Sequence, residues 1–282
     1  MGVDLHTHSA ASDGSDPPAQ LVRLAAACGL STLALTDHDT QEGVEEARRA
    51  AGPLGIDLIA GTELSLEHES GGMHLVVLWL EPGPGPLQDH LVSLRVGRDR
   101  RNRTIVEVLT ELGMPISVEE ITEEGGAGSV GRPHIAAVMV QKGYTQDIRT
   151  AFDDWLGSGK PAYVERPRLG PEEAIALARQ SGGVPVLAHP HTLGINRAAA
   201  MADLLHRLKS AGLVGLEAFY SSYHRHEREG YADLARRFGL IPSGGSDYHG
   251  SYKPGLELRI GYGDLNVPEA CLEELSGFAG FS

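Results

Sequence analysis

The sequence predicts an α/β fold built on a mostly parallel sheet or barrel that is interrupted by a run of helices. Short apolar runs alternate with amphipathic helical patterns over the N-terminal third, as strands and helices do in proteins of this class. The alternation stops at the Gly-Pro-rich segment 81–86 and resumes near residue 184. The 282 residues suffice for one large domain or for a barrel with an insertion.

Each element of the barrel has its own signal in the sequence. The strands are short and apolar, and we expect them at residues 3–8, 31–36, 57–60, 73–80, 184–188, 214–219 and 240–243. The helices show apolar residues at helical spacing, and we expect them at residues 17–28, 40–54, 199–211, 225–238 and 268–278. Asp16 is the expected N-cap of the first helix, with Pro17 in its first turn.

The segment between the two runs of alternation shows helical patterns and no convincing strand. Its expected helices cover residues 87–112, 118–121, 133–142 and 145–156. We therefore predict a first part of the barrel at residues 1–86, a helical insertion at 87–182 and the rest of the barrel at 183–282. We interpret the Gly-rich stretch 125–131 as a flexible connection before a helix that starts at Pro133.

Charge and composition exclude several classes of function. The chain has 38 acidic and 24 basic residues, a formal net charge of −14, which disfavours broad binding to nucleic acid or to an anionic membrane. The longest aliphatic run, about residues 75–80, is far shorter than the roughly 20 residues of a membrane-spanning helix. The two cysteines form no paired motif, so we expect a soluble protein of the reducing cytoplasm. The oligomeric state stays open.

Most of the residues that could bind a metal ion or take part in catalysis come at or just after an expected strand. They are Asp4, His6, His8, Asp13, Asp37, His38, Asp39, Glu63, His189, His191, Asp247 and His249. Such a gathering at the C-terminal ends of strands is typical of an active site on an α/β barrel. In Asp4-Leu5-His6-Thr7-His8 the alternate residues share one face of the strand, so two imidazoles can bind one ion. Histidine and carboxylate ligands without thiolate favour catalytic Mn, Fe or Zn.

Six motifs occur in a specific order. DLHTHSAASDG, LTDHDT, GTELS, GRPHIA, LAHPH and GGSDYH run from residue 4 to residue 249. Together they resemble the PHP (polymerase and histidinol phosphatase) family of metal-dependent phosphoesterases. Within it, the chain is most similar to the branch that dephosphorylates small nucleotides, including 3′,5′-nucleoside bisphosphates, and to related 5′-end-trimming exoribonucleases. The helical insertion with GRPHIA points to that branch.

The resemblance implies a distorted (β/α)7 TIM-like barrel that holds two to three divalent ions. It implies a first ion bound by His6, His8, Glu63 and Asp247, a second bound by Glu63, His74 and His134, and a third bound by Asp13, His38 and His249. Asp4 and Asp37 would not bind an ion themselves. They would accept hydrogen bonds and so orient the residues that do.

The resemblance also implies hydrolysis by a metal-bound hydroxide that attacks phosphorus in line. Arg132, two residues before His134, is our candidate for balancing charge on the phosphate oxygens. His189 or His191 would contact the phosphate or protonate the leaving oxygen, and the sequence does not choose between them.

Two further features have two interpretations each. Arg98 and Arg101 are i, i+3 neighbours on a helix, and they either bind a second phosphate or lie on a solvated face paired with Asp and Glu. Glu217 ends a strand and either bonds the substrate or supports a loop.

We expect a phosphatase for small nucleotides, either nucleoside monophosphates or 3′,5′-bisphosphates. The alternatives are a 5′-3′ exoribonuclease on short RNA, a histidinol-phosphate or sugar-phosphate phosphatase, and a non-catalytic module that serves a polymerase. Three ligand carboxylates and three divalent ions would leave a local charge of about +3. An acidic chain can therefore bind a compact nucleotide or a very short oligonucleotide, but no long nucleic acid and no membrane.

Overall fold

A computed structural model describes residues 2–69, 72–125, 130–165 and 168–280. The middle of the predicted Gly-rich connection, residues 126–129, lies outside the described residues. In the described part of the chain, no helix is long and apolar enough to cross a membrane.

Among the described residues, seven strands form one sheet, in which each strand pairs with the next along the chain. They are β1 (Gly2–Asp4), β2 (Leu30–Leu35), β3 (Asp57–Leu66), β4 (Met73–Leu78), β5 (Val184–Leu187), β6 (Gly215–Tyr220) and β7 (Ile241–Gly245). β4 runs antiparallel to both neighbours, and the other neighbouring pairs are parallel. The Leu5 amide donates to the Gly244 carbonyl at 3.2 Å, and the Asp247 amide donates to the His6 carbonyl at 2.8 Å. These bonds bring the ends of the sheet together, so the predicted distorted seven-stranded barrel is confirmed.

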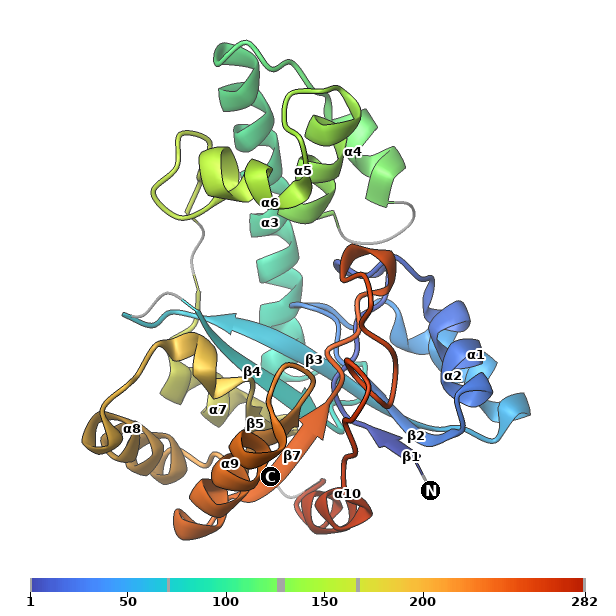
Figure 1. Cartoon of the computed structure of the whole chain (residues 1–282), viewed down its shortest axis with the longest axis vertical. Helices are drawn as coiled ribbons and strands as arrows, with labels where there is room; N and C mark the ends of the chain where they lie inside the picture. Colours follow the sequence, from blue (N-terminus) through green and yellow to red (C-terminus); the bar gives the residue numbers. More distant parts are fainter. Residues whose placement is uncertain (1, 70–71, 126–129, 166–167, 281–282) are drawn as a thin grey trace.

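Helices cover the outside of the barrel (Figure 1). They are α1 (Pro18–Ala27), α2 (Val44–Leu54), α7 (Pro171–Gln180), α8 (Ala198–Ser210), α9 (Arg225–Arg237) and α10 (Glu269–Ser276). Each buries an apolar face: Leu21 of α1 and Val44 of α2 pack with Leu33 of β2, for example. Burying such faces against a sheet is what stabilises a layered α/β fold.

A second group of helices stands above the barrel in Figure 1. It contains α3 (Pro86–Glu111), α4 (Val118–Gly125), α5 (Arg132–Gln141), α6 (Ile148–Ala151) and a π-helical turn, η1 (Phe152–Leu156). These helices share an apolar cluster of their own that includes Ile105, Ile121 and Ile135. The long α3 joins the two parts of the molecule, because Leu87 and Leu91 near its start pack in the cluster of the barrel.

Helix α7 was missed at the sequence level, although Pro171 at its start and Glu172 and Glu173 in its first turn are helix-start signals. It packs against β5 and β3 and so covers the barrel. The boundaries of the predicted insertion at residues 87–182 stay a prediction.

Two local expectations were wrong. β3 does not end at residue 60 but runs to Leu66, because it pairs with β4 from Gly61↔Leu78 to Leu66↔Met73. Glu63 therefore lies within a strand of this antiparallel pair and not after it. Asp16 does not cap α1: Pro17 is at the N-cap, and the Asp16 carboxylate accepts a hydrogen bond from the Tyr248 hydroxyl at 2.9 Å.

Barrel closure leaves no room for a side chain at Gly245. A Cβ atom at this position would lie 2.4 Å from the His6 amide nitrogen and 2.5 Å from the His6 Cβ. We expect Gly245→Ala to lower the free energy of unfolding by about 1–3 kcal/mol through overpacking. Gly52→Ala is the matched control, because a Cβ at Gly52 of α2 meets nothing within 4 Å, and it should stabilise by roughly 0.5–1 kcal/mol. Urea unfolding measures both, and equal stabilities would contradict the close-approach argument.

Candidate metal centre

Five imidazoles surround the buried carboxylate of Glu63. His6 Nε2, His8 Nε2 and His38 Nδ1 lie 3.2, 3.1 and 3.3 Å from its Oε2. His74 Nδ1 and His189 Nε2 lie 3.0 and 2.9 Å from its Oε1. The side chains come from the ends of β1, β2 and β5 and from the β3–β4 pair, so the closed barrel brings them to one point.

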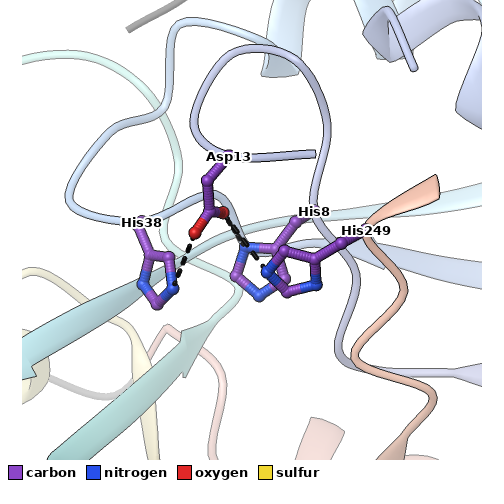
Figure 2. A group of neighbouring side chains, drawn as sticks. All are labelled: His8, Asp13, His38 and His249. Atoms are coloured by element: carbon purple, nitrogen blue, oxygen red, sulfur yellow. Dashed lines mark ion pairs between the residues drawn. The ribbon is translucent and has the colours of Figure 1, made fainter. Parts of the chain in front are cut away.

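The centre contains three groups whose ligand atoms lie within 4.8 Å of one another. The groups are His6, His8, Glu63 and Asp247; His8, Asp13, His38 and His249; and His38, Glu63 and His74. Figure 2 shows the second group, in which the Asp13 carboxylate faces three imidazoles. Its oxygens lie 3.6 Å from His38 Nε2 and 3.3 Å from His249 Nε2.

The donor atoms fit divalent metal ions. Nitrogen and carboxylate oxygen without sulfur is the set that catalytic transition-metal sites use. Within the described residues, His8 Nδ1 and His38 Nδ1 are buried and make no well-aligned hydrogen bond, although a carboxylate oxygen lies 3.6 and 3.3 Å away. Buried polar atoms are normally paired, so such nitrogens in a ring of carboxylates indicate a role in binding a cation.

Burial and the neighbouring charges shift the pKa values of these groups. Burial disfavours the charged form of His6, but the carboxylates of Glu63, Glu217 and Asp247 outweigh it and raise its pKa well above the usual value. Burial also opposes a charged His8, but hydrogen bonds to Asp247 and Glu63 raise its pKa to about 9. The centre is thus a strong local concentration of negative charge that attracts cations.

The carboxylates keep that charge. Burial alone would raise the pKa of Glu63, yet nearby His38, His6 and His74 hold it well below the usual range. Asp247 behaves in the same way, and the charge of Lys253 is the largest effect that opposes its burial.

Asp247 is held in an unusual conformation. Its backbone φ is 56°, in the left-handed region that non-glycine residues rarely adopt, at a cost on the order of 1–3 kcal/mol. Its Oδ2 accepts hydrogen bonds from the Tyr220 hydroxyl at 2.8 Å and from Lys253 Nζ at 2.5 Å. Its Oδ1 therefore points to the histidines and lies 3.2 Å from His8 Nε2.

Lys253 was not predicted as a member of the site, and the contact of Tyr220 with Asp247 was not expected. The available signal for Lys253 was weak: it is one of only four lysines and lies four residues after His249 in the GGSDYH motif. Tyr220 ends β6, where a residue facing the site is expected.

Glu217 orients two of the histidines. Its Oε1 lies 2.9 Å from His6 Nδ1, and its Oε2 accepts a hydrogen bond from the His189 amide at 2.7 Å. This buried carboxylate fixes which His6 nitrogen faces the other ligands, as outer carboxylates do in metal sites. Glu217 was expected either to bond the substrate or to support a loop; it supports the loop backbone at His189 and, in addition, the His6 ring.

In the part of the chain that the structure describes, Asp4 and Asp37 accept hydrogen bonds from loop residues and none from a ligand ring. Asp4 accepts hydrogen bonds from the amides of Ser246 at 2.8 Å and Arg259 at 3.0 Å. Asp37 accepts from the Ser9 amide at 2.8 Å and from the Ser12 hydroxyl at 2.6 Å. They position ligands indirectly, because these loops precede Asp247 and Asp13.

His134 lies outside the three groups. It is in the first turn of α5, and its Nδ1 accepts a hydrogen bond from the Gly131 amide at 3.0 Å. A neutral ring with Nδ1 as acceptor carries its proton on Nε2 and has no lone pair left for an ion. This geometry does not support the expectation that His134 binds the second ion.

The three predicted arginines line one cavity beside the metal groups. Arg98, Arg101 and Arg132 share this cavity of about 290 Å³ with Asp13, His38 and His74. Arg98 also donates to the Asp39 carboxylate at 2.9 Å and to the His38 carbonyl at 2.7 Å, so it ties α3 to the loop after β2. Arg98 and Arg101 are buried, so the predicted solvated face is wrong, although Arg98 does pair with the Asp39 carboxylate. Their binding of a second phosphate stays a prediction.

His191 lies near the edge of the centre. It is exposed, its Nδ1 lies 3.0 Å from the Tyr223 hydroxyl, and its ring is 6.3 Å from that of His189. Of the two histidines of LAHPH, only His189 contacts Glu63 in the described structure.

Comparison with known proteins identifies the class. Residues 4–115 match the PHP domain. The chain is 33% identical to a 3′,5′-nucleoside bisphosphate phosphatase of Chromobacterium violaceum over 91% of this chain and 90% of that protein. It is 35% identical to a 5′-3′ exoribonuclease of Haemophilus influenzae over 87% of this chain and 89% of the relative.

Solved structures agree with this result. A Bifidobacterium adolescentis protein, provisionally assigned as a metal-dependent phosphoesterase, superposes with a TM-score of 0.86 at 30% identity, covering 99% of this chain and 96% of that one. A Chromobacterium violaceum protein described as an amidohydrolase, with bound sulfate and no metal, gives a TM-score of 0.86 at 31% identity, covering 99% and 97%. The protein is therefore an enzyme of the metal-dependent phosphoesterase class. The chain belongs to the PHP family.

Glu217 offers a test of the outer part of the centre. We expect Glu217→Gln to lower Mn²⁺ affinity about 10–100-fold, because the neutral amide no longer orients His6 as the carboxylate does. Isothermal titration calorimetry measures this affinity. Glu229→Gln is the matched control, since Glu229 is an exposed partner of Arg225 on α9. Equal Mn²⁺ affinities of the two variants would contradict the role given to Glu217.

Proposed function

We propose that this protein hydrolyses phosphomonoesters of small nucleotides, namely nucleoside monophosphates or 3′,5′-bisphosphates. The observation that carries the proposal is the cavity in which Arg98, Arg101 and Arg132 meet Asp13, His38 and His74. Guanidinium groups are suited to phosphate, and metal ligands beside them are suited to phosphoester hydrolysis. The relatives named as a nucleoside bisphosphate phosphatase and an exoribonuclease support a nucleotide substrate.

We propose that two to three divalent ions, Mn, Fe or Zn, bind in the centre. His6, His8, Glu63 and Asp247 would hold one; Asp13, His38 and His249 another; and Glu63, His74 and His189 a third. We assign to His189 the place first expected for His134, because its Nε2 lies 2.9 Å from Glu63 Oε1. When bound, such ions lower the pKa of water toward neutrality and offset the charge of the phosphate.

The chain's own side chains bind and orient the substrate. Arg132 binds the phosphate and balances its charge through two parallel donors. Arg98 and Arg101 add positive charge to the lining of the same cavity. The backbone amide of His191 donates to the Tyr223 hydroxyl, which can in turn donate to His191 Nδ1. That arrangement leaves His191 Nε2 as a donor for the substrate at the edge of the centre.

A substrate panel tests the function. Purified protein loaded with Mn²⁺ should release phosphate from AMP and from a 3′,5′-bisphosphate faster than from histidinol phosphate. A short 5′-phosphorylated RNA in the same panel tests the exoribonuclease alternative. Absence of phosphate release from every nucleotide would refute the proposal.

The substitution Arg132→Lys tests whether Arg132 binds the phosphate. The substitution keeps the charge but removes the planar fork, and we expect kcat/KM to fall about 100-fold. Arg149→Lys is the control, because Arg149 is an exposed partner of Asp153. An unchanged kcat/KM in Arg132→Lys would contradict the proposal that Arg132 binds the phosphate.

A further inference from the structure

Two loops provide ligands of one candidate metal group. We call it the Asp13 group, and its members are His8, Asp13, His38 and His249. Asp13 lies in the loop of residues 9–16 after β1, and His249 lies in the loop of residues 246–252 after β7. The side chains of Asp13 and His38 are 20% and 18% exposed, whereas the four ligands proposed for the first ion are at most 6% exposed. The geometry of the Asp13 group therefore depends on how the two loops are held together.

Hydrogen bonds join the two loops close to these ligands. The Tyr248 hydroxyl donates to the Asp16 carboxylate at 2.9 Å, and the Ser251 amide donates to the Ser15 hydroxyl at 2.8 Å. The Ser15 amide in turn donates to the His249 carbonyl at 3.1 Å. None of these bonds uses a ligand side chain, so they hold the loops together without occupying the atoms that would bind an ion.

The two loops approach each other so closely that one position requires glycine. Gly250 has a φ of 66°, in the left-handed region that glycine adopts readily. A Cβ atom there would collide with the Ser15 hydroxyl and would lie 2.7 Å from the Asp16 carboxylate. Beside this contact, the Asp13 carboxylate lies 3.3 Å from His249 Nε2. The contact between the loops thus sets how far apart the two ligands lie.

We propose that Ser15, Asp16 and Tyr248 form a brace that sets the affinity of the Asp13 group for its ion. They are positioning residues: they are not ligands themselves, and they act by holding Asp13 and His249 at the separation that one ion requires. Loops are usually more mobile than the elements they connect, and a metal site needs ligands that are held in the geometry of the bound ion. The inference rests on the proposed function, because it concerns one of the ions proposed there.

Two conservative substitutions weaken the brace. Tyr248→Phe removes the hydroxyl and keeps the ring, which packs against the apolar cluster that α1, α2 and β2 share. Ser15→Ala removes the acceptor of the Ser251 amide. The matched control is Tyr144→Phe, which also loses one hydroxyl hydrogen bond, to the Pro115 carbonyl at 3.1 Å, but lies among the helices above the barrel.

The experiment measures Mn²⁺ binding to the metal-free protein by equilibrium dialysis. We expect Tyr248→Phe and Ser15→Ala each to weaken the binding of one ion about 10-fold and to leave the affinities of the other ions unchanged, because only the Asp13 group is built on the two loops. Tyr144→Phe should bind Mn²⁺ as the wild type does. Unchanged affinities in both brace variants would overturn the proposal, and so would an equal loss of affinity for every ion.

The variant Asp13→Asn identifies the ion that the brace affects. It should lose the ion of the Asp13 group at Mn²⁺ concentrations that saturate the wild type. Tyr248→Phe added to this variant should then leave the affinities of the remaining ions unchanged, and further weakening in the double variant would overturn the proposal.

The same titrations keep this inference separate from the proposed function. An Asp13→Asn variant that binds as many ions as the wild type would overturn the brace, while the ions of the other groups would still permit the proposed hydrolysis. A protein that shows the expected binding but releases no phosphate from any nucleotide would refute only the proposed function.

Discussion

The buried carboxylate of Glu63 is the constraint on which the site depends. It is 1% exposed and has five imidazoles within 3.3 Å. A buried charge is costly unless it is paired, and breaking such a pairing leaves an uncompensated charge in the interior. The imidazoles come from four separate places in the chain. The barrel must therefore close, and its strands must keep their register, for Glu63 to be compensated at all.

Several features that have no contact with a substrate serve this requirement. Gly245 allows the end of β7 to approach His6, and Asp4 binds the Ser246 amide in the same region. Glu217 contacts the His6 nitrogen that faces away from the other ligands and so orients the ring. Lys253 binds Oδ2 of Asp247, so that Oδ1 faces the histidines. Arg98 extends the support to α3, since it binds both the Asp39 carboxylate and the His38 carbonyl. The helices above the barrel are thereby connected to the metal centre.

Much of this arrangement could be predicted from the sequence, because ordered motifs report which side chains gather at strand ends. His6, His8, Asp13, His38, Glu63, His74, Asp247 and His249 were named as ligands and lie in the groups that could hold metal. Local patterns could not show that β3 and β4 pair antiparallel, which places Glu63 and His74 on neighbouring strands. They also could not show that His134 uses Nδ1 to accept a backbone hydrogen bond, or that Tyr220 and Lys253 bind Asp247. Those facts depend on contacts between distant segments.

Glu63 belongs to two of the three candidate metal groups, whereas the group of His8, Asp13, His38 and His249 does not include it. The most direct measurement is the number of Mn²⁺ ions per chain in the wild type and in Glu63→Gln, determined by elemental analysis after equilibrium dialysis. The expected result is that this nearly isosteric change removes more than one ion, because one carboxylate serves two groups. A variant that retains the full wild-type number of ions would contradict the central place of Glu63.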